Sequence, residues 1–229
     1  MRCKRCIKSP TNGFEPKLNM DAWNSNPNLK ESHNCFAYAM NAIDTKLVKK
    51  CKDDSGCDVG FHQPGYASGF KRFADQKEKG CGDMVSRLWG DNPKVVAAEF
   101  EDRCPNGTSK IALIVDPMRD YHFLRQDTDG YWSHKPGAMN VTRVDASDRP
   151  IIRPDRATFL YTQHTDPLLY TKFCGYFCVP RSKAVHMMTD VRQGGSLIGE
   201  DSALKSSETP SRYQQTRKRS RGEHHSSTG

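Results

Sequence analysis

The sequence predicts an α+β fold for this chain of 229 residues. Apolar residues recur at helical spacing in residues 33–43 and again in residues 83–101, whereas the segments typical of β-strands all follow residue 109. The helices therefore come first and the strands after them. We expect an antiparallel sheet, not the alternating strands and helices of a parallel one.

The first predicted helix spans residues 33–43. Either Ser32 or Asn34 can serve as its N-cap, because both side chains accept a hydrogen bond from free backbone N–H groups. Either choice places Cys35 in the first turn of the helix.

A long loop is expected over residues 51–82, which are rich in Gly, Lys and Asp. We expect it to lead into a short helix near residues 67–77. A second helix is predicted over residues 83–101, with Pro93 interrupting it because proline cannot donate the helical hydrogen bond.

The strands begin with residues 110–116 (KIALIVD), a continuous apolar run typical of a buried strand. Residues 121–126 and 131–135 flank a turn and form a predicted hairpin. Further strands are expected near residues 139–144 and within residues 168–179.

The hairpin turn fixes a register. If residues 128–130 form the loop, with Gly130 at the left-handed position, Asp127 pairs with Tyr131. His122 and His134 then become diagonal neighbours on one face, about 7–8 Å apart by Cβ. A slip of one residue would place them on opposite faces.

Composition divides the chain into three predicted parts. Residues 1–30 hold few apolar residues and are expected to be a flexible segment, residues 31–185 form the domain, and residues 190–229 form a disordered basic tail containing residues 217–221 (RKRSR). The net charge of +8 favours an acidic partner or nucleic acid. No base-reading motif is present, so nucleic-acid binding through the tail would be nonspecific.

The chain has nine cysteines, an odd number, and its start has no apolar stretch typical of a secretory signal. We therefore expect most of them to be thiols in a reducing compartment, and the protein to be intracellular and cytoplasmic. Cysteine spacings match no compact zinc motif, so neither metal nor cofactor is predicted. No apolar run approaches the ~20 residues of a membrane span, so none is predicted.

One set of residues suggests catalysis. A cysteine at a helix N-terminus is favoured as a thiolate, and His122 on a strand can accept its proton, with His134 fixing the imidazole tautomer. The amide of Gln63, next to His62, is a candidate oxyanion-hole donor. A packed core cysteine, and a surface histidine at position 134, are alternatives that stay open.

The chain resembles the papain-like cysteine hydrolase superfamily near its NlpC/P60 branch, over roughly residues 30–180. The resemblance rests on residues 33–41 (HNCFAYAMN), 63–65 (QPG), 120–122 (DYH) and 125–137 (RQDTDGYWSHKPG). Similar strings occur in uncharacterised proteins of bacteria and of large double-stranded DNA viruses.

The resemblance implies a papain-like core with Cys35 as nucleophile, His122 as base and His134 as the third polar residue. There are departures. Asn-Cys-Phe-Ala replaces the usual Asp-Cys-Ser-Gly, and Gln63 follows the cysteine instead of preceding it.

Two functional hypotheses follow. The first is a thiol protease or related hydrolase that cleaves an amide, peptide or acyl bond. The second is a minor capsid protein of a large DNA virus, located in the virion, with weak or no activity. Its flexible termini would then bind viral structural proteins.

Overall fold

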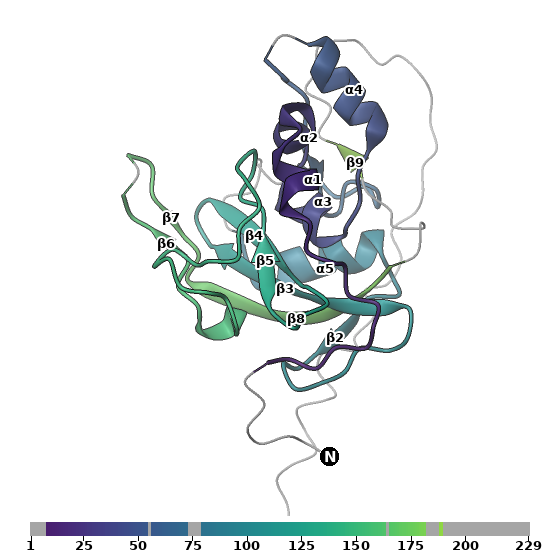
Figure 1. Cartoon of the computed structure of the whole chain (residues 1–229), viewed down its shortest axis with the longest axis vertical. Helices are drawn as coiled ribbons and strands as arrows, with labels where there is room; N and C mark the ends of the chain where they lie inside the picture. The colour runs from purple at the N-terminus through teal and green to yellow at the C-terminus, as the bar shows by residue number, and fades with distance from the viewer. Residues whose placement is uncertain (1–7, 55, 73–78, 164, 182–187, 190–229) are drawn as a thin grey trace, which may run out of the picture. The chain divides into compact units, whose positions relative to one another are not determined.

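The computed structural model describes residues 8–54, 56–72, 79–163, 165–181 and 188–189, and it confirms the α+β class. The main sheet has five antiparallel strands in the order β2-β8-β3-β4-β5 (Figure 1). Their bounds are β2 Val96–Ala98, β3 Thr108–Asp116, β4 Asp120–Gln126, β5 Trp132–His134 and β8 Lys172–Pro180. Two short pairs lie outside it, β1 (His62–Gln63) with β9 (Met188–Thr189) and β6 (Leu160–Tyr161) with β7 (Leu168–Leu169).

Five α-helices are described: α1 Met20–Asn24, α2 Pro27–Ser32, α3 Cys35–Ala39, α4 Thr45–Asp53 and α5 Cys81–Asp91. A 3-10 turn spans Pro154–Arg156. Asn or Asp side chains cap the first four helices at their N-termini. The third helix is shorter than the predicted 33–43, since Asn41 adopts a left-handed backbone with φ +55°.

The predicted hairpin register is confirmed. Leu124 pairs with His134, and the Asp127 N–H donates to the Tyr131 carbonyl over 2.9 Å. Gly130 supplies the positive φ, +80°, that closes the loop. The strand expected near residues 139–144 is reduced to isolated bridges, one of them between His134 and Thr142.

The sheet has an apolar layer on each face. One layer joins the sheet to α3 and α5 through Phe36, Met40, Met84, Leu88, Leu113 and Phe123. The other layer contains Ala112, Ile114, Leu124, Trp132, Ile151, Phe159 and Tyr176. Because side chains alternate along a strand, His122 shares the second layer's face and Phe123 the first.

The predicted helix over residues 83–101 is wrong in its second half. Helix α5 ends at Asp91, two residues before Pro93, and Val96–Ala98 form edge strand β2 paired with β8. Near residues 67–77 the described part contains turns, and residues 73–78 lie outside the described residues.

Residues 8–30 were expected to be flexible but pack on the domain. The Ser9 hydroxyl donates to the Phe100 carbonyl over 2.7 Å and accepts from the buried Lys110 ammonium, also over 2.7 Å. Trp23 on α1 is 3% exposed and packs edge-on against Tyr38. The remainder of the expected flexible start, residues 1–7, lies outside the described residues.

The chain divides into two compact units, residues 1–192 and 193–229. The second unit, and with it most of the predicted basic tail, lies outside the described residues. Among the helices described, none is long and apolar enough to cross a membrane.

The expectation that most cysteines are thiols is wrong for six of them. Disulfides join Cys51 to Cys57, Cys81 to Cys174 and Cys104 to Cys178. The sequence spacing was uninformative here, because two of the three bridges close loops of 93 and 74 residues. Within the described residues Cys35 remains a free, buried thiol.

Candidate functional site

Cys35 is the first residue of α3, as predicted. Asn34 caps the helix, since its Oδ1 accepts from the Ala37 N–H over 3.2 Å, and its Nδ2 donates to the His62 carbonyl over 2.9 Å. The cap therefore fixes Cys35 relative to β1. The helix has only five residues, so its dipole is weaker than the predicted 33–43 helix implied.

The Cys35 sulfur faces the edge of β4. Strand β5 pairs only with residues 124–126, which leaves residues 120–123 without a β5 partner. Burial and the Asp120 carboxylate raise the pKa of the Cys35 thiol to about 12, while backbone N–H groups of Phe123 and Phe36 hydrogen-bond the sulfur and oppose the rise. At neutral pH Cys35 is therefore a protonated thiol.

The two predicted histidines are in direct contact. Nε2 of His122 and Nδ1 of His134 are 2.8 Å apart, and Nε2 of His134 is 2.9 Å from the Val144 carbonyl. A carbonyl only accepts, so His134 donates through Nε2 and accepts from His122 through Nδ1. His122 then carries its proton on Nε2, and its Nδ1 is left with a lone pair.

Both imidazoles are neutral at physiological pH. Burial, and secondarily the neighbouring His134, lower the pKa of His122 well below 6.5. Burial also lowers the pKa of His134 to about 4, against the opposing effect of the Val144 carbonyl. The hydrogen-bonded pair therefore presents a neutral base and not an imidazolium.

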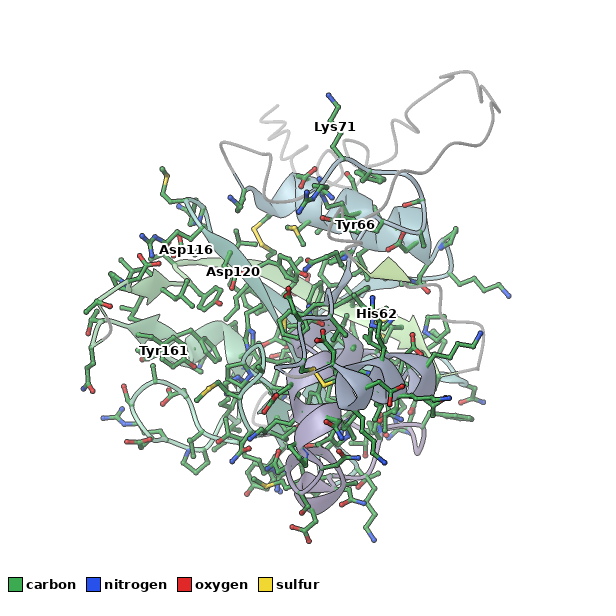
Figure 2. All side chains as sticks on the ribbon, turned by 90° about the horizontal axis from the view of Figure 1, so that it is seen from above. His62, Tyr66, Lys71, Asp116, Asp120 and Tyr161 are labelled. Carbon is green, nitrogen blue, oxygen red and sulfur yellow. A yellow bond between two sulfur atoms is a disulfide. The ribbon has the colours of Figure 1, made fainter. Side chains whose placement is uncertain are left out.

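Cys35 and His122 line the same cavity, which we call the aromatic pocket. Its volume is about 690 Å³, and its other lining residues include Gln63, Tyr66, Asp120, Tyr121, Met139, Tyr161, Leu168 and Tyr170. Asp120 lies between Tyr66 and Tyr161 in the view from above (Figure 2). Within the described residues no hydrogen bond joins Cys35 to His122, and the two residues share only the lining of this pocket.

Gln63 lies on β1 at the rim of this pocket, consistent with its predicted position near the cysteine. Its Oε1 accepts a hydrogen bond from the Tyr121 hydroxyl. This bond fixes the orientation of the side-chain amide, whose NH₂ group remains the donor that an oxyanion would need.

No functional role was predicted from the sequence for Lys135 or Asp120, although both lie in the segments that carry the resemblance, residues 125–137 and 120–122. Lys135 is fully buried, and its ammonium donates to the carbonyls of Lys30, His33 and Gly137 over 2.5–2.6 Å. It ties the residues before Cys35 to the end of β5, and burial lowers the pKa of Lys135 to about 7. Asp120 accepts from the Tyr170 hydroxyl over 2.7 Å, and burial raises its pKa.

Cys51, Cys57, Cys81 and Cys104, whose spacings match no compact zinc motif, all form disulfides. Cys51 is bonded to Cys57, and Cys81 and Cys104 are each bonded to a cysteine of β8. Glu31 lies near the Cys51–Cys57 pair, but a disulfide offers no thiolate to a metal ion.

Comparison with known proteins identifies a relative that aligns with most of this chain. The chain is 34% identical over 173 residues to the "Insoluble matrix shell protein 1" of Ruditapes philippinarum, an alignment that covers 74% of this chain and 92% of that protein. No protein-family model and no solved structure matches the chain. The papain-like resemblance therefore stays a prediction.

Proposed function

We propose that this chain, which belongs to the family of the insoluble matrix shell protein 1, catalyses thiol-dependent acyl transfer or hydrolysis in the aromatic pocket. One observation carries the proposal. The chain of hydrogen bonds from His122 through His134 to the Val144 carbonyl leaves an unprotonated Nδ1 on a histidine that lines the same pocket as the free thiol. A papain-like core fits this order of groups.

In the proposed reaction the thiol of Cys35 gives its proton to Nδ1 of His122 as the sulfur attacks the substrate carbonyl. The thiol and the imidazole are both neutral beforehand, so the proton moves during attack and not before it. The Gln63 amide stabilises the oxyanion. His122 then returns its proton to the leaving group, and water or an amine releases the acyl group from the sulfur.

We further propose that the protein works in an oxidising compartment, against the intracellular location predicted above. The three disulfides support this, since such bonds persist in secreted and extracellular proteins and are rare in the cytosol. Cys35 would then remain a free thiol because its buried position keeps it from forming a disulfide with another cysteine.

A structural role is the second candidate. The relative's name describes an insoluble matrix protein of a shell, which favours a matrix component over the viral capsid component considered above. Such a role requires no reaction at Cys35. Under this alternative the pocket would serve packing or binding alone.

Trapping of an acyl-enzyme separates these functions. We would incubate the full chain with p-nitrophenyl acetate and map mass increases over all cysteine-containing peptides. We expect an acetyl group on Cys35 that is absent in Cys35→Ser and formed about 10²–10⁴-fold more slowly in His122→Ala. An unmodified Cys35, or equal rates in wild type and His122→Ala, would overturn the catalytic proposal and leave the structural one.

A further inference from the structure

We infer that Asn106 and Asn140 are acceptor sites for N-linked oligosaccharides, and that the glycan on Asn140 stands at the mouth of the aromatic pocket. This inference rests on the oxidising compartment proposed above, because eukaryotic cells add such glycans to proteins on the secretory route. It does not require any reaction at Cys35.

The acceptor motif for this modification is short. It consists of asparagine, then any residue except proline, then serine or threonine. The chain has ten asparagines, and two of them meet the motif, in residues 106–108 (NGT) and 140–142 (NVT). A pattern of three residues also arises by chance, so the placement of each asparagine in the fold provides the second test.

Both acceptor asparagines are exposed in the folded chain. Asn106 lies in the turn before β3, which closes as the Thr108 N–H donates to the Pro105 carbonyl over 3.1 Å. Asn140 lies in the loop that follows β5. Within the part of the chain that the structure describes, neither side-chain amide makes a hydrogen bond. A glycan is bulky and hydrophilic, so an acceptor that stays in solvent after folding can carry one.

Most other asparagines serve the fold instead, because their side chains hydrogen-bond within it. Six of the other eight do so, namely Asn12, Asn19, Asn24, Asn26, Asn34 and Asn41. Three of these cap helices α1, α2 and α3. The motif therefore falls on two asparagines whose amide nitrogen the fold leaves available.

The loop that carries Asn140 is fixed on its inner side. Val141 is 1% exposed, and its N–H donates to Oδ1 of Asn24 over 2.7 Å. Thr142 exchanges two backbone hydrogen bonds with His134, each of 2.9 Å. These contacts hold Asn140 at one place on the surface.

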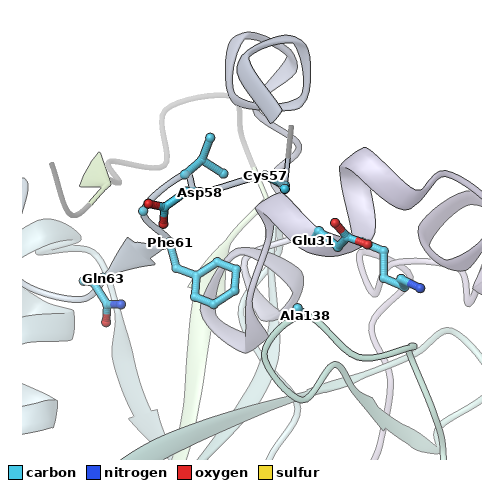
Figure 3. A pocket seen from close by; sticks show the side chains of 10 residues that line it. Glu31, Cys57, Asp58, Phe61, Gln63 and Ala138 are labelled. Atoms are coloured by element: carbon cyan, nitrogen blue, oxygen red, sulfur yellow. The ribbon is translucent and has the colours of Figure 1, made fainter. Parts of the chain in front are cut away.

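That place is the edge of the aromatic pocket. Asn140 is exposed and also lines the pocket, so it lies where the pocket meets solvent. Ala138 of the same loop also lines a neighbouring cavity of about 500 Å³, as does Gln63 (Figure 3). A glycan on Asn140 would therefore stand beside the entrance to both cavities and hinder large molecules from reaching Cys35.

Asn106 provides the matched comparison, because it lies at the opposite end of β3. The strand begins at Thr108, and Ile114 is the residue that pairs with His122. At about 3.3 Å per residue, the turn is roughly 20 Å from the site. A glycan on Asn106 should leave the pocket open.

The modification is a transfer of a sugar chain from a lipid-pyrophosphate-linked oligosaccharide. The asparagine nitrogen attacks the anomeric carbon of the first sugar. A nitrogen–carbon bond forms while the carbon–oxygen bond to pyrophosphate breaks, the amide loses one proton, and the lipid pyrophosphate leaves. The transferase of the host cell catalyses this reaction, so no residue of the aromatic pocket takes part.

Peptide mapping tests both sites. We would direct the full chain into the secretory pathway of insect cells and treat the secreted protein with peptide N-glycosidase in heavy-oxygen water. The enzyme leaves a labelled aspartate wherever it removes a glycan. We expect label at Asn106 and at Asn140. A parallel sample without the enzyme measures spontaneous deamidation of the Asn106-Gly107 pair, and the absence of label above this control would overturn the assignment at either asparagine.

Substitutions at the third position of each motif leave the asparagine in place. Thr142→Ala should abolish the label at Asn140 and keep that at Asn106, whereas Thr142→Ser preserves the motif and should retain both. Thr108→Ala should have the converse effect. Label that survives the loss of the threonine would overturn N-linked glycosylation at that site.

Alkylation of Cys35 tests the position of the second glycan. Cys35 should react with a maleimide bearing a polyethylene glycol chain at least about threefold faster in secreted Asn140→Gln than in wild type, and within about twofold of wild type in Asn106→Gln. Iodoacetamide, which is small, should react at similar rates in all three. Equal rates with the large reagent would overturn the placement at the pocket mouth.

The glycan sites and the proposed function fail separately. If the three disulfides form but neither asparagine carries label, the oxidising compartment stands and the glycan sites are refuted. If both asparagines are labelled while Cys35 accepts no acyl group, the glycan sites stand and the catalytic function is refuted.

Discussion

The disulfides give the sharpest quantitative prediction. Cys81–Cys174 closes a loop of 93 residues and Cys51–Cys57 one of 6 residues. In the chain-entropy description, a cross-link stabilises the fold by restricting the unfolded chain, and longer loops gain more. Loop closure then contributes about 4.6 kcal/mol for the long loop and about 2.2 kcal/mol for the short one.

We expect Cys81→Ser/Cys174→Ser to lower the free energy of unfolding by about twice as much as Cys51→Ser/Cys57→Ser. Urea unfolding followed by circular dichroism, without reductant, measures both differences. The third bridge, with its loop of 74 residues, should behave like the longer of the two.

Counting the free thiols tests whether the three disulfides are formed. Denatured but unreduced protein should react with iodoacetamide at Cys35, and the six bridged cysteines should react only after dithiothreitol. Alkylation of those six without reductant would refute the reasoning and restore the expectation of a reduced chain.

Three further predictions concern the site and its support. Lys135→Met leaves the buried His33 carbonyl and the partly buried Lys30 and Gly137 carbonyls without their donor. The free energy of unfolding should therefore fall by about 2–4 kcal/mol in urea titrations, with Lys135→Arg closer to wild type. Full stability of the Met variant would contradict the role assigned to the ammonium. Acyl transfer needs neutral His122, whose pKa lies well below 6.5. The rate of acyl transfer should therefore stay constant as the pH falls through 6.5 and decline only at more acidic pH. A decline centred at pH 6.5 or above would refute a buried base. Gly65→Ala should lower the free energy of unfolding by more than about 2 kcal/mol, because the added Cβ would lie 2.7 Å from the Arg87 side chain at a φ of +87°. Gly69→Ala has a similar φ of +80° but open space around the added Cβ, and should lower it by about 1 kcal/mol. Equal shifts of the melting temperature in the two variants would argue against the steric cause.

The hairpin was predictable because its information is local. Turn composition fixed Gly130 at the left-handed position, and a two-residue side-chain period then placed His122 and His134 on one face. The same reasoning located Cys35 at a helix start, because asparagine and serine caps act within a few residues.

The remaining features depend on partners far along the chain. Val96–Ala98 are apolar enough for either a helix or a strand. They form a strand because they pair with β8, about 80 residues later in the chain. The disulfide partners, and the three carbonyls that accept from Lys135, follow from the finished topology. The ordered path of residues 8–18 depends likewise on contacts with residues about 100 positions away, such as Lys110.

Two of the disulfides end on the same strand, β8, and this has a consequence for proteolysis. The intervening residues 105–173 carry His122 and His134 and include the exposed turn around Asp148. A single cut in that turn leaves two fragments that remain covalently joined through both bridges. A nicked chain would therefore migrate as one species until reduced, and the cut itself would detach neither imidazole from the body that carries the thiol.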